Sequence, residues 1–178
     1  MKLAVLDIAP TLAMYEQTNE AFARAYWHWF FLIQPAPLPE RLIAGDPDAY
    51  FDHHLRSIGL GVAAGRYPDA ILDAYRRQLS DPQIVEAICE DYRAGAAIDR
   101  QLDDADRAAG RRITCPVLCL WGRRGALEIF YGDVLGIWRP WATAISGRGL
   151  DASHFLAEDR PDEVAAELIA FLAPTRGG

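Results

Sequence analysis

The sequence predicts an α/β protein in which a block of helices is inserted between strands of one parallel sheet. Two continuous apolar runs, at residues 2–6 and 113–122, have the composition of strands that are buried on both faces. The apolar residues between these runs follow the spacing of helices. We therefore expect a sheet core formed by residues 1–10 and 110–178, with a helical insertion at residues 11–109.

The first expected strand, KLAVL at residues 2–6, ends at Asp7. Open α/β sheets keep their ligands and catalytic groups at the carboxyl ends of their strands. Asp7 is therefore a candidate site residue, although an aspartate at this position can also cap the segment that follows.

The inserted block is expected to contain several helices. The first begins at Thr11 as its N-cap, carries one apolar stripe from Tyr15 to Ile33 and ends before Pro35. Pro37 and Pro39 are expected to keep the next segment extended. Three more helices share a proline in the first turn next to an aspartate that caps it. These three are expected at residues 46–57, 67–79 and 81–94, and a polar helix follows at residues 98–109.

The core resumes with the second strand at residues 113–122. A helix at 126–138, a short strand at 143–146 and a last helix at 162–172 follow it. His154 lies in the loop that precedes this last helix.

Charge and hydropathy exclude several classes of partner. The formal net charge is -7 and no basic face stands out, which argues against nucleic-acid binding. No apolar run reaches the length of a membrane span, and the opening residues do not resemble a signal peptide. We expect a cytoplasmic protein without a membrane partner.

The cysteines predict neither a disulfide framework nor a metal site. Cys89, Cys115 and Cys119 are accompanied by no C-x-x-C or H-E-x-x-H motif, so small apolar core residues are the simpler interpretation. We expect no metal and no cofactor.

The run YWHWFF at residues 26–31 concentrates aromatic side chains with N–H donors. Such density is typical of a core, but buried histidine and tryptophan side chains must satisfy their donors. The run therefore either fills a core or forms the polar side of a pocket.

The segment DASHFLAEDRPDEVAAELIAFL, residues 151–172, carries the most specific motif. It resembles the last strand, histidine loop and final helix of α/β-hydrolases. The resemblance implies that His154 is a general base, which an acid must orient. We favour Asp7 as this acid over Glu128, because Asp7 ends the neighbouring strand; a loop histidine that only caps the next helix is the alternative.

A narrower resemblance covers nearly the whole chain. The runs LDIAPT, YWHWFFLIQPAPLPERLI, GDPDAY, CEDYRAGA and LWG are similar to those of the fluoroacetate and haloacetate dehalogenases of the α/β-hydrolase fold. This implies a halide site formed by His28, Trp29 and Tyr92 of the helical lid. Ile58 stands where the family tends to have a tryptophan, and is expected to line an apolar wall of the substrate pocket.

The implied chemistry needs these residue types. A departing fluoride requires donors at the position where its charge develops, and imidazole, indole and phenol groups supply them. Ordinary lid packing is the alternative for each. Arg93 and Arg123–Arg124 could attract a carboxylate substrate, although surface solubility is the commoner role for such residues.

The aspartate nucleophile of this family sits in a G-x-nucleophile-x-G elbow, a motif that does not occur in these 178 residues. In the family this elbow precedes the strand that residues 2–6 match. We therefore expect a partial α/β-hydrolase fold, comprising the last strands of a parallel sheet with an inserted helical lid, and an inactive fragment. Whether the chain acts as an enzyme is thus open.

Other interpretations stay open at this point. The expected substrate is a small halocarboxylic acid, and a homodimer or a separate chain supplying the missing half are both conceivable partners. Another α/β-hydrolase activity, such as epoxide hydrolysis with Tyr92 and Tyr26 as acids, is one alternative. A non-catalytic binding protein built on the lid helices is another.

Overall fold

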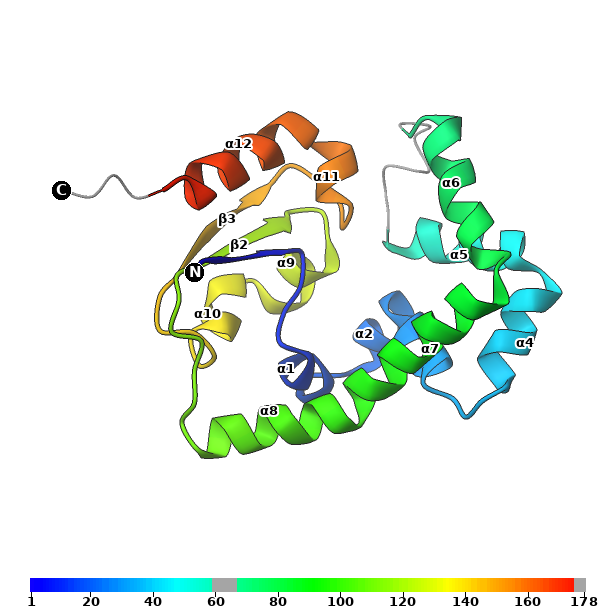
Figure 1. Cartoon of the computed structure of the whole chain (residues 1–178), viewed down its shortest axis with the longest axis horizontal. Coiled ribbons are helices and arrows are strands. Elements are labelled where there is room, and N and C mark those ends of the chain that lie inside the picture. The colour runs from blue at the N-terminus through cyan, green and yellow to red at the C-terminus, as the bar shows by residue number, and fades with distance from the viewer. Residues whose placement is uncertain (59–66, 175–178) are drawn as a thin grey trace. The chain divides into compact units, whose positions relative to one another are not determined.

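The computed structural model describes residues 1–58 and 67–174, which form two compact units (Figure 1). Residues 1–10 and 107–178 contribute to the sheet unit, and residues 11–106 contribute to the helical unit.

The sheet unit contains three parallel strands among its described residues, in the order β1-β2-β3. These strands are β1 (Leu3–Leu6), β2 (Val117–Gly122) and β3 (Ile145–Leu150). The central strand is β2, and its first four residues are all buried, as the apolar run predicts. It begins later than expected, because Pro116 has no N–H to donate and Ile113 forms only an isolated bridge.

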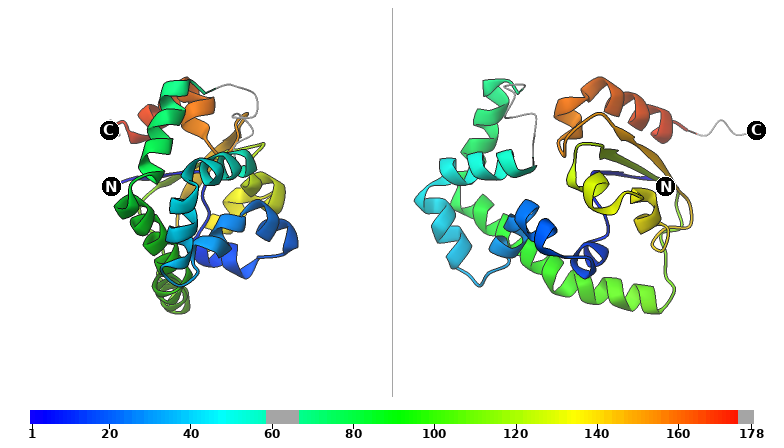
Figure 2. Two further views of the ribbon diagram at one scale, coloured as in Figure 1. Left: turned by 90° about the vertical axis from the view of Figure 1, so that its right-hand side faces the viewer. Right: turned by 180° about the vertical axis from the view of Figure 1, so that it is seen from behind.

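Helices cover both faces of this sheet (Figures 1 and 2). Helix α12 (Pro161–Leu172) packs on one face, and α9 (Ala126–Tyr131) and α10 (Val134–Trp138) lie on the other. The core under α12 combines alternate strand residues with one stripe of the helix. Its buried members are Leu118, Leu120, Leu150, Ala152, Leu156 and Val164.

The expected single helix at residues 126–138 is wrong. Gly132 has φ +65°, a left-handed conformation that ends α9, and the Asp133 side chain then accepts a bond from Gly136 N–H to begin α10. The structure also adds a short helix, α11 (Leu156–Asp159), directly after the His154 loop.

The helical unit begins with three short helices and continues with longer ones. They are α1 (Thr11–Glu16), α2 (Glu20–Ala25), α3 (Trp27–Leu32), α4 (Leu38–Gly45), α5 (Pro47–Ile58), α6 (Asp69–Leu79), α7 (Pro82–Ala96) and α8 (Ile98–Ala108). Helices occur at all three places predicted from a proline beside an aspartate, as α5, α6 and α7, but the predicted aspartate cap is wrong for α6, where Pro68 occupies the N-cap and no side chain caps the helix. The Asp81 side chain caps α7 by accepting from Gln83 N–H at 2.9 Å.

Two predictions for residues 11–39 are wrong. One apolar stripe does not make one helix here, because Asn19 starts a new helix by accepting from Phe22 N–H at 3.0 Å, and Tyr26 leaves helical geometry. The proline-rich segment is not extended throughout, since α4 begins at Leu38 and tolerates Pro39 in its first turn.

The core of the helical unit joins α3, α4 and α7. Leu32, Ile43, Val85 and Cys89 are each at most 3% exposed and pack together, with Tyr92 at the margin. No helix within the described residues is long and apolar enough to cross a membrane.

Candidate active site

Asp7 occupies a constrained position directly after β1. Its φ of +48° lies in the left-handed region, which aspartate tolerates better than most residues, and its side chain is fully buried. The Gly122 N–H at the end of β2 donates to Asp7 Oδ1 at 2.9 Å. One carboxylate oxygen is thus held by the backbone of the neighbouring strand, as is common where local strain serves a site.

The other oxygen of Asp7 holds His154. The His154 Nδ1 atom lies 2.7 Å from Asp7 Oδ2, while about a third of the imidazole side chain stays exposed. Because a carboxylate only accepts, Nδ1 is assigned as the donor. This tautomer leaves Nε2 as the proton-accepting nitrogen, which is the arrangement of a histidine base oriented by an acid.

Glu128, the alternative acid, is engaged elsewhere. It lies in α9, and its carboxylate accepts from the indole Nε1–H of Trp121. The structure therefore brings His154 together with Asp7, and directs Glu128 to a tryptophan.

Cys119 is a core residue beside this pair. Burial, and then the Asp7 carboxylate, raise the pKa of its thiol to about 12, so the sulfur stays protonated at neutral pH. All three cysteines are free, and the described residues contain no His, Cys, Asp and Glu group that could hold a metal ion.

The three residues predicted for a halide site meet inside the helical unit. His28 and Trp29 lie on α3, and Tyr92 lies on α7. The His28 and Tyr92 ring centroids are 5.7 Å apart, and those of Trp29 and Tyr92 are 6.0 Å apart. His28 is only 2% exposed, while Trp29 and Tyr92 are partly buried.

Tyr92 keeps its hydroxyl proton over the whole physiological range. Burial is the main cause, with smaller contributions from Asp91 and Tyr15, and together they raise its pKa to about 12. Its phenol is therefore an O–H group that can donate.

His54 is a member of this cluster that sequence reasoning missed. Its ring centroid lies 4.3 Å from that of His28, with the two planes at 84°, and Tyr50 stacks on it at 5.8 Å. His54 lies outside every run on which the resemblance rests, so nothing in the sequence marked it.

Two of the three arginines considered for substrate binding, Arg93 and Arg124, form internal ion pairs. Arg93 pairs with Glu40 and Glu90, each at 2.7 Å, and also donates to the Gln34 carbonyl. The Arg93 hydrogen bond is the main reason that the pKa of Glu40 lies below its usual value. Arg124 pairs with acidic side chains near the His154 loop.

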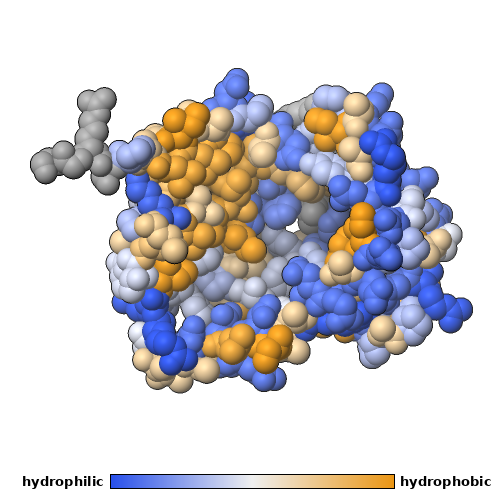
Figure 3. Space-filling model, in the orientation of Figure 1, coloured by the Kyte–Doolittle hydropathy of each residue, from blue (hydrophilic) through white to orange (hydrophobic). Residues whose placement is uncertain are grey.

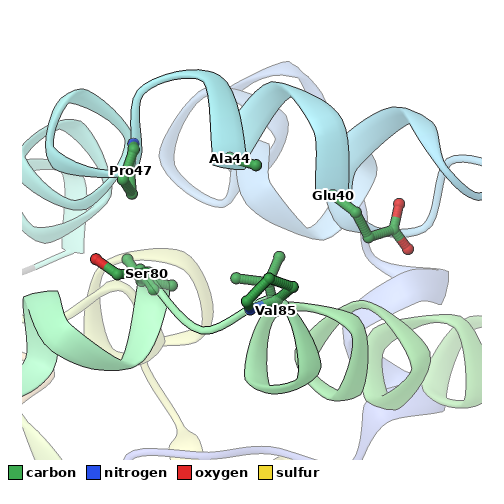
Figure 4. Close-up of a pocket in the computed structure, with 7 residues that line it drawn as sticks. Glu40, Ala44, Pro47, Ser80 and Val85 are labelled. Carbon is green, nitrogen blue, oxygen red and sulfur yellow. The ribbon is translucent and has the colours of Figure 1, made fainter.

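Ile58, the predicted pocket-wall residue, is the last residue of α5, but its side chain lies outside the described residues. A cavity of about 180 Å³ opens between α4 and α7, where Figure 4 shows Ala44 and Val85 on opposite walls. None of the predicted halide residues lines it.

The chain is similar to known proteins over all or nearly all of its length. No family model matches it. The chain is 40% identical to a fluoroacetate dehalogenase from Burkholderia sp. over 178 residues, which is all of this chain and 57% of that protein.

Solved structures agree on the architecture. A protein from Nostoc sp. PCC 7120, classed as an α/β-hydrolase, matches with a TM-score of 0.90 and 44% identity, over 98% of this chain and 58% of its own. The chain has part of the α/β-hydrolase fold. A protein from Pseudomonas aeruginosa, classed as an epoxide hydrolase, matches with a TM-score of 0.86 and 42% identity, over 96% of this chain and 56% of its own.

This chain therefore spans somewhat more than half the length of the proteins it matches. The predicted fold class and the resemblance to fluoroacetate dehalogenase are confirmed. The names of the relatives indicate two different reactions, so the substrate has to be argued from the residues.

Proposed function

We propose that this chain supplies the base, its acid and the halide donors of an α/β-hydrolase that cleaves the carbon–halogen bond of a small halocarboxylic acid such as fluoroacetate. The observation that carries the proposal is the 2.7 Å contact between His154 Nδ1 and buried Asp7. The 40% identity to fluoroacetate dehalogenase supports the choice of substrate.

In the proposed mechanism Asp7 fixes the tautomer of His154 and stabilises the imidazolium that forms. The Nε2 atom of His154 takes a proton from water, and the resulting hydroxide attacks the carbonyl of an ester formed when a carboxylate nucleophile displaced the halide. These 178 residues hold no elbow motif for that nucleophile. In this proposal it comes from outside them, from a preceding segment or a separate chain.

The donors proposed for the departing halide are His28, Trp29 and Tyr92. An imidazole, an indole and a phenol converging on one ion can stabilise charge that appears only in the transition state. Removing one donor of this kind costs about 10²–10³-fold in kcat, so Tyr92→Phe should lower turnover without abolishing it.

The test joins the part of the Burkholderia sp. relative that this chain does not cover in frame before Met1. We expect the fusion to release fluoride from fluoroacetate, and expect His154→Ala to abolish the release. The 178-residue chain alone should release none. Release by that chain alone, lost in His154→Ala, would contradict the requirement for an outside nucleophile.

Epoxide hydrolysis is the second candidate, because the Pseudomonas aeruginosa structure is 42% identical to this chain. It requires two tyrosine acids, for which Tyr92 and Tyr26 are the candidates, and the Tyr26 ring stacks on that of Phe22 at 4.9 Å. A fusion that opens an epoxide and releases no fluoride would favour this reaction. Binding of fluoroacetate without turnover would instead indicate a non-catalytic binding protein.

A further inference from the structure

The loop that carries His154 is attached to a buried carboxylate that follows it in sequence. Asp159 lies in α11, and its side chain is 1% exposed. Its Oδ2 atom accepts from the backbone N–H of Ser153 at 2.6 Å. Ser153 is itself 1% exposed and directly precedes His154, so this bond fixes the peptide from which the imidazole projects.

The Asp159 carboxylate belongs to a network of charged side chains whose other members are more exposed to solvent. The guanidinium of Arg124 lies 3.8 Å from Asp159 Oδ2 and also contacts Asp151. Arg160 contacts Asp151 in turn, at 2.6 Å. Asp151 is 63% exposed, and exposed ion pairs contribute little, so the buried Asp159 is the member of this network that can position the loop.

On its other side, the loop contacts Gly122 at the end of β2, the residue whose N–H donates to Asp7. A Cβ atom on Gly122 would lie 2.1 Å from the Ser153 carbonyl oxygen, so the two backbones are in close contact. Gly122 N–H also donates to Asp7, and Arg124 N–H donates to the Ala152 carbonyl at 3.0 Å. Ser153 is therefore held between the Asp159 carboxylate and the end of β2.

We propose that Asp159 is a positioning residue that sets His154 Nδ1 on Asp7 by accepting the Ser153 N–H. Its importance for turnover rests on the proposed function, while the positioning itself can be measured without any reaction. A displacement of about 1 Å in a catalytic group can cost 10²-fold in rate, so a single buried acceptor at this loop matters.

The experiment follows the low-field Nδ1 proton resonance of His154 in the 178-residue chain labelled with ¹⁵N-histidine. The resonance is assigned by its loss in Asp7→Asn. We expect Asp159→Ala to abolish this resonance while the circular dichroism spectrum remains that of a folded protein. Asp159→Asn keeps an oxygen that can accept from Ser153, and should retain the resonance.

Asp162→Ala is the matched control, because Asp162 is an exposed acid in the first turn of the neighbouring helix α12. It should leave the resonance unchanged. A resonance that survives in folded Asp159→Ala, or disappears in folded Asp159→Asn, would overturn the proposal.

Amide exchange in the unsubstituted chain provides a second measurement, in case Asp159→Ala unfolds. The Ser153 N–H should be strongly protected, and exchange as fast as that of exposed amides would refute the bond to Asp159. These outcomes are separate from the enzyme assay. Failure to release fluoride with an intact His154 resonance would reject the proposed reaction and leave the positioning role standing.

Discussion

At the residue scale, both carboxylate oxygens of Asp7 have a defined partner. One oxygen accepts from Gly122 N–H, the other faces His154, and the backbone is left-handed. Asparagine fits the same backbone, but its NH₂ group would face Nδ1 and favour the wrong imidazole tautomer. We expect Asp7→Asn to lower kcat/KM of the fusion enzyme for fluoroacetate by about 10⁴-fold, with folding retained. A loss below tenfold would contradict the role of Asp7.

Gly122 has no room for a side chain. An added Cβ would meet the Ser153 carbonyl oxygen at 2.1 Å, and backbone cannot move aside as a side-chain tip can. Gly122→Ala should lower the free energy of unfolding by about 1–3 kcal/mol, as measured by urea denaturation. Gly45→Ala is the control, because no atom lies within 4 Å of its added Cβ. That helical substitution should be neutral or stabilising, by up to about 1 kcal/mol.

The raised pKa of Tyr92 links folding to pH in the alkaline range. Its pKa is about 12 in the folded chain, against 10.0 for an ordinary tyrosine. The folded state therefore favours the protonated phenol, and this contribution is complete below pH 10 and is lost as the pH rises towards 12. We expect Tyr92→Phe to reduce the loss of stability between pH 10 and pH 12 in denaturant titrations. The same dependence in both proteins would contradict burial of the phenol.

At the scale of the element, local capping decided where helices begin and end. The apolar stripe from residue 15 to residue 33 is continuous in sequence, but Asn19 caps a new helix inside it. In the same way Gly132 divides the helix expected at residues 126–138. Periodicity identified helical chain in both places, and the capping residues set its boundaries.

Helix α7 offers a direct measure of such a cap. Asp81 accepts from Gln83 N–H, and the helix carries Tyr92 and Arg93. Asp81→Ala should cost about 1 kcal/mol in the free energy of unfolding. Asp69→Ala in the first turn of α6, where no side-chain capping bond forms, should cost less. Equal losses in thermal denaturation would show that charge near the helix start matters more than the capping bond.

At the scale of the whole molecule, β1 is an edge strand of the described sheet. Leu6 is 37% exposed and Ile8 46% exposed, and Figure 3 shows apolar side chains gathered on the surface over β1 and α12. Unpaired strand edges with apolar side chains promote association. We expect the isolated chain to self-associate as its concentration rises, and expect Ile8→Lys to reduce this in analytical ultracentrifugation. Ile129→Lys, at an exposed position of α9, should not.

The sequence by itself determined the parallel α/β class, the buried central strand β2, the helices that begin near a proline, and the similarity to fluoroacetate dehalogenase; it also predicted the strand at residues 2–6, but not that β1 would be a partly exposed edge strand. These features depend on local periodicity, turn residues and motifs, which a linear chain displays. It also nominated Asp7 and His154. Their 2.7 Å contact, the ring contact of His54 with His28, and the bond from Ser153 N–H to Asp159 were decided only by the tertiary structure. The sequence predicted that Asp7 orients His154, but the contact distances depend on how backbone and side chains pack in three dimensions, and no residue pattern indicated His54 or Asp159.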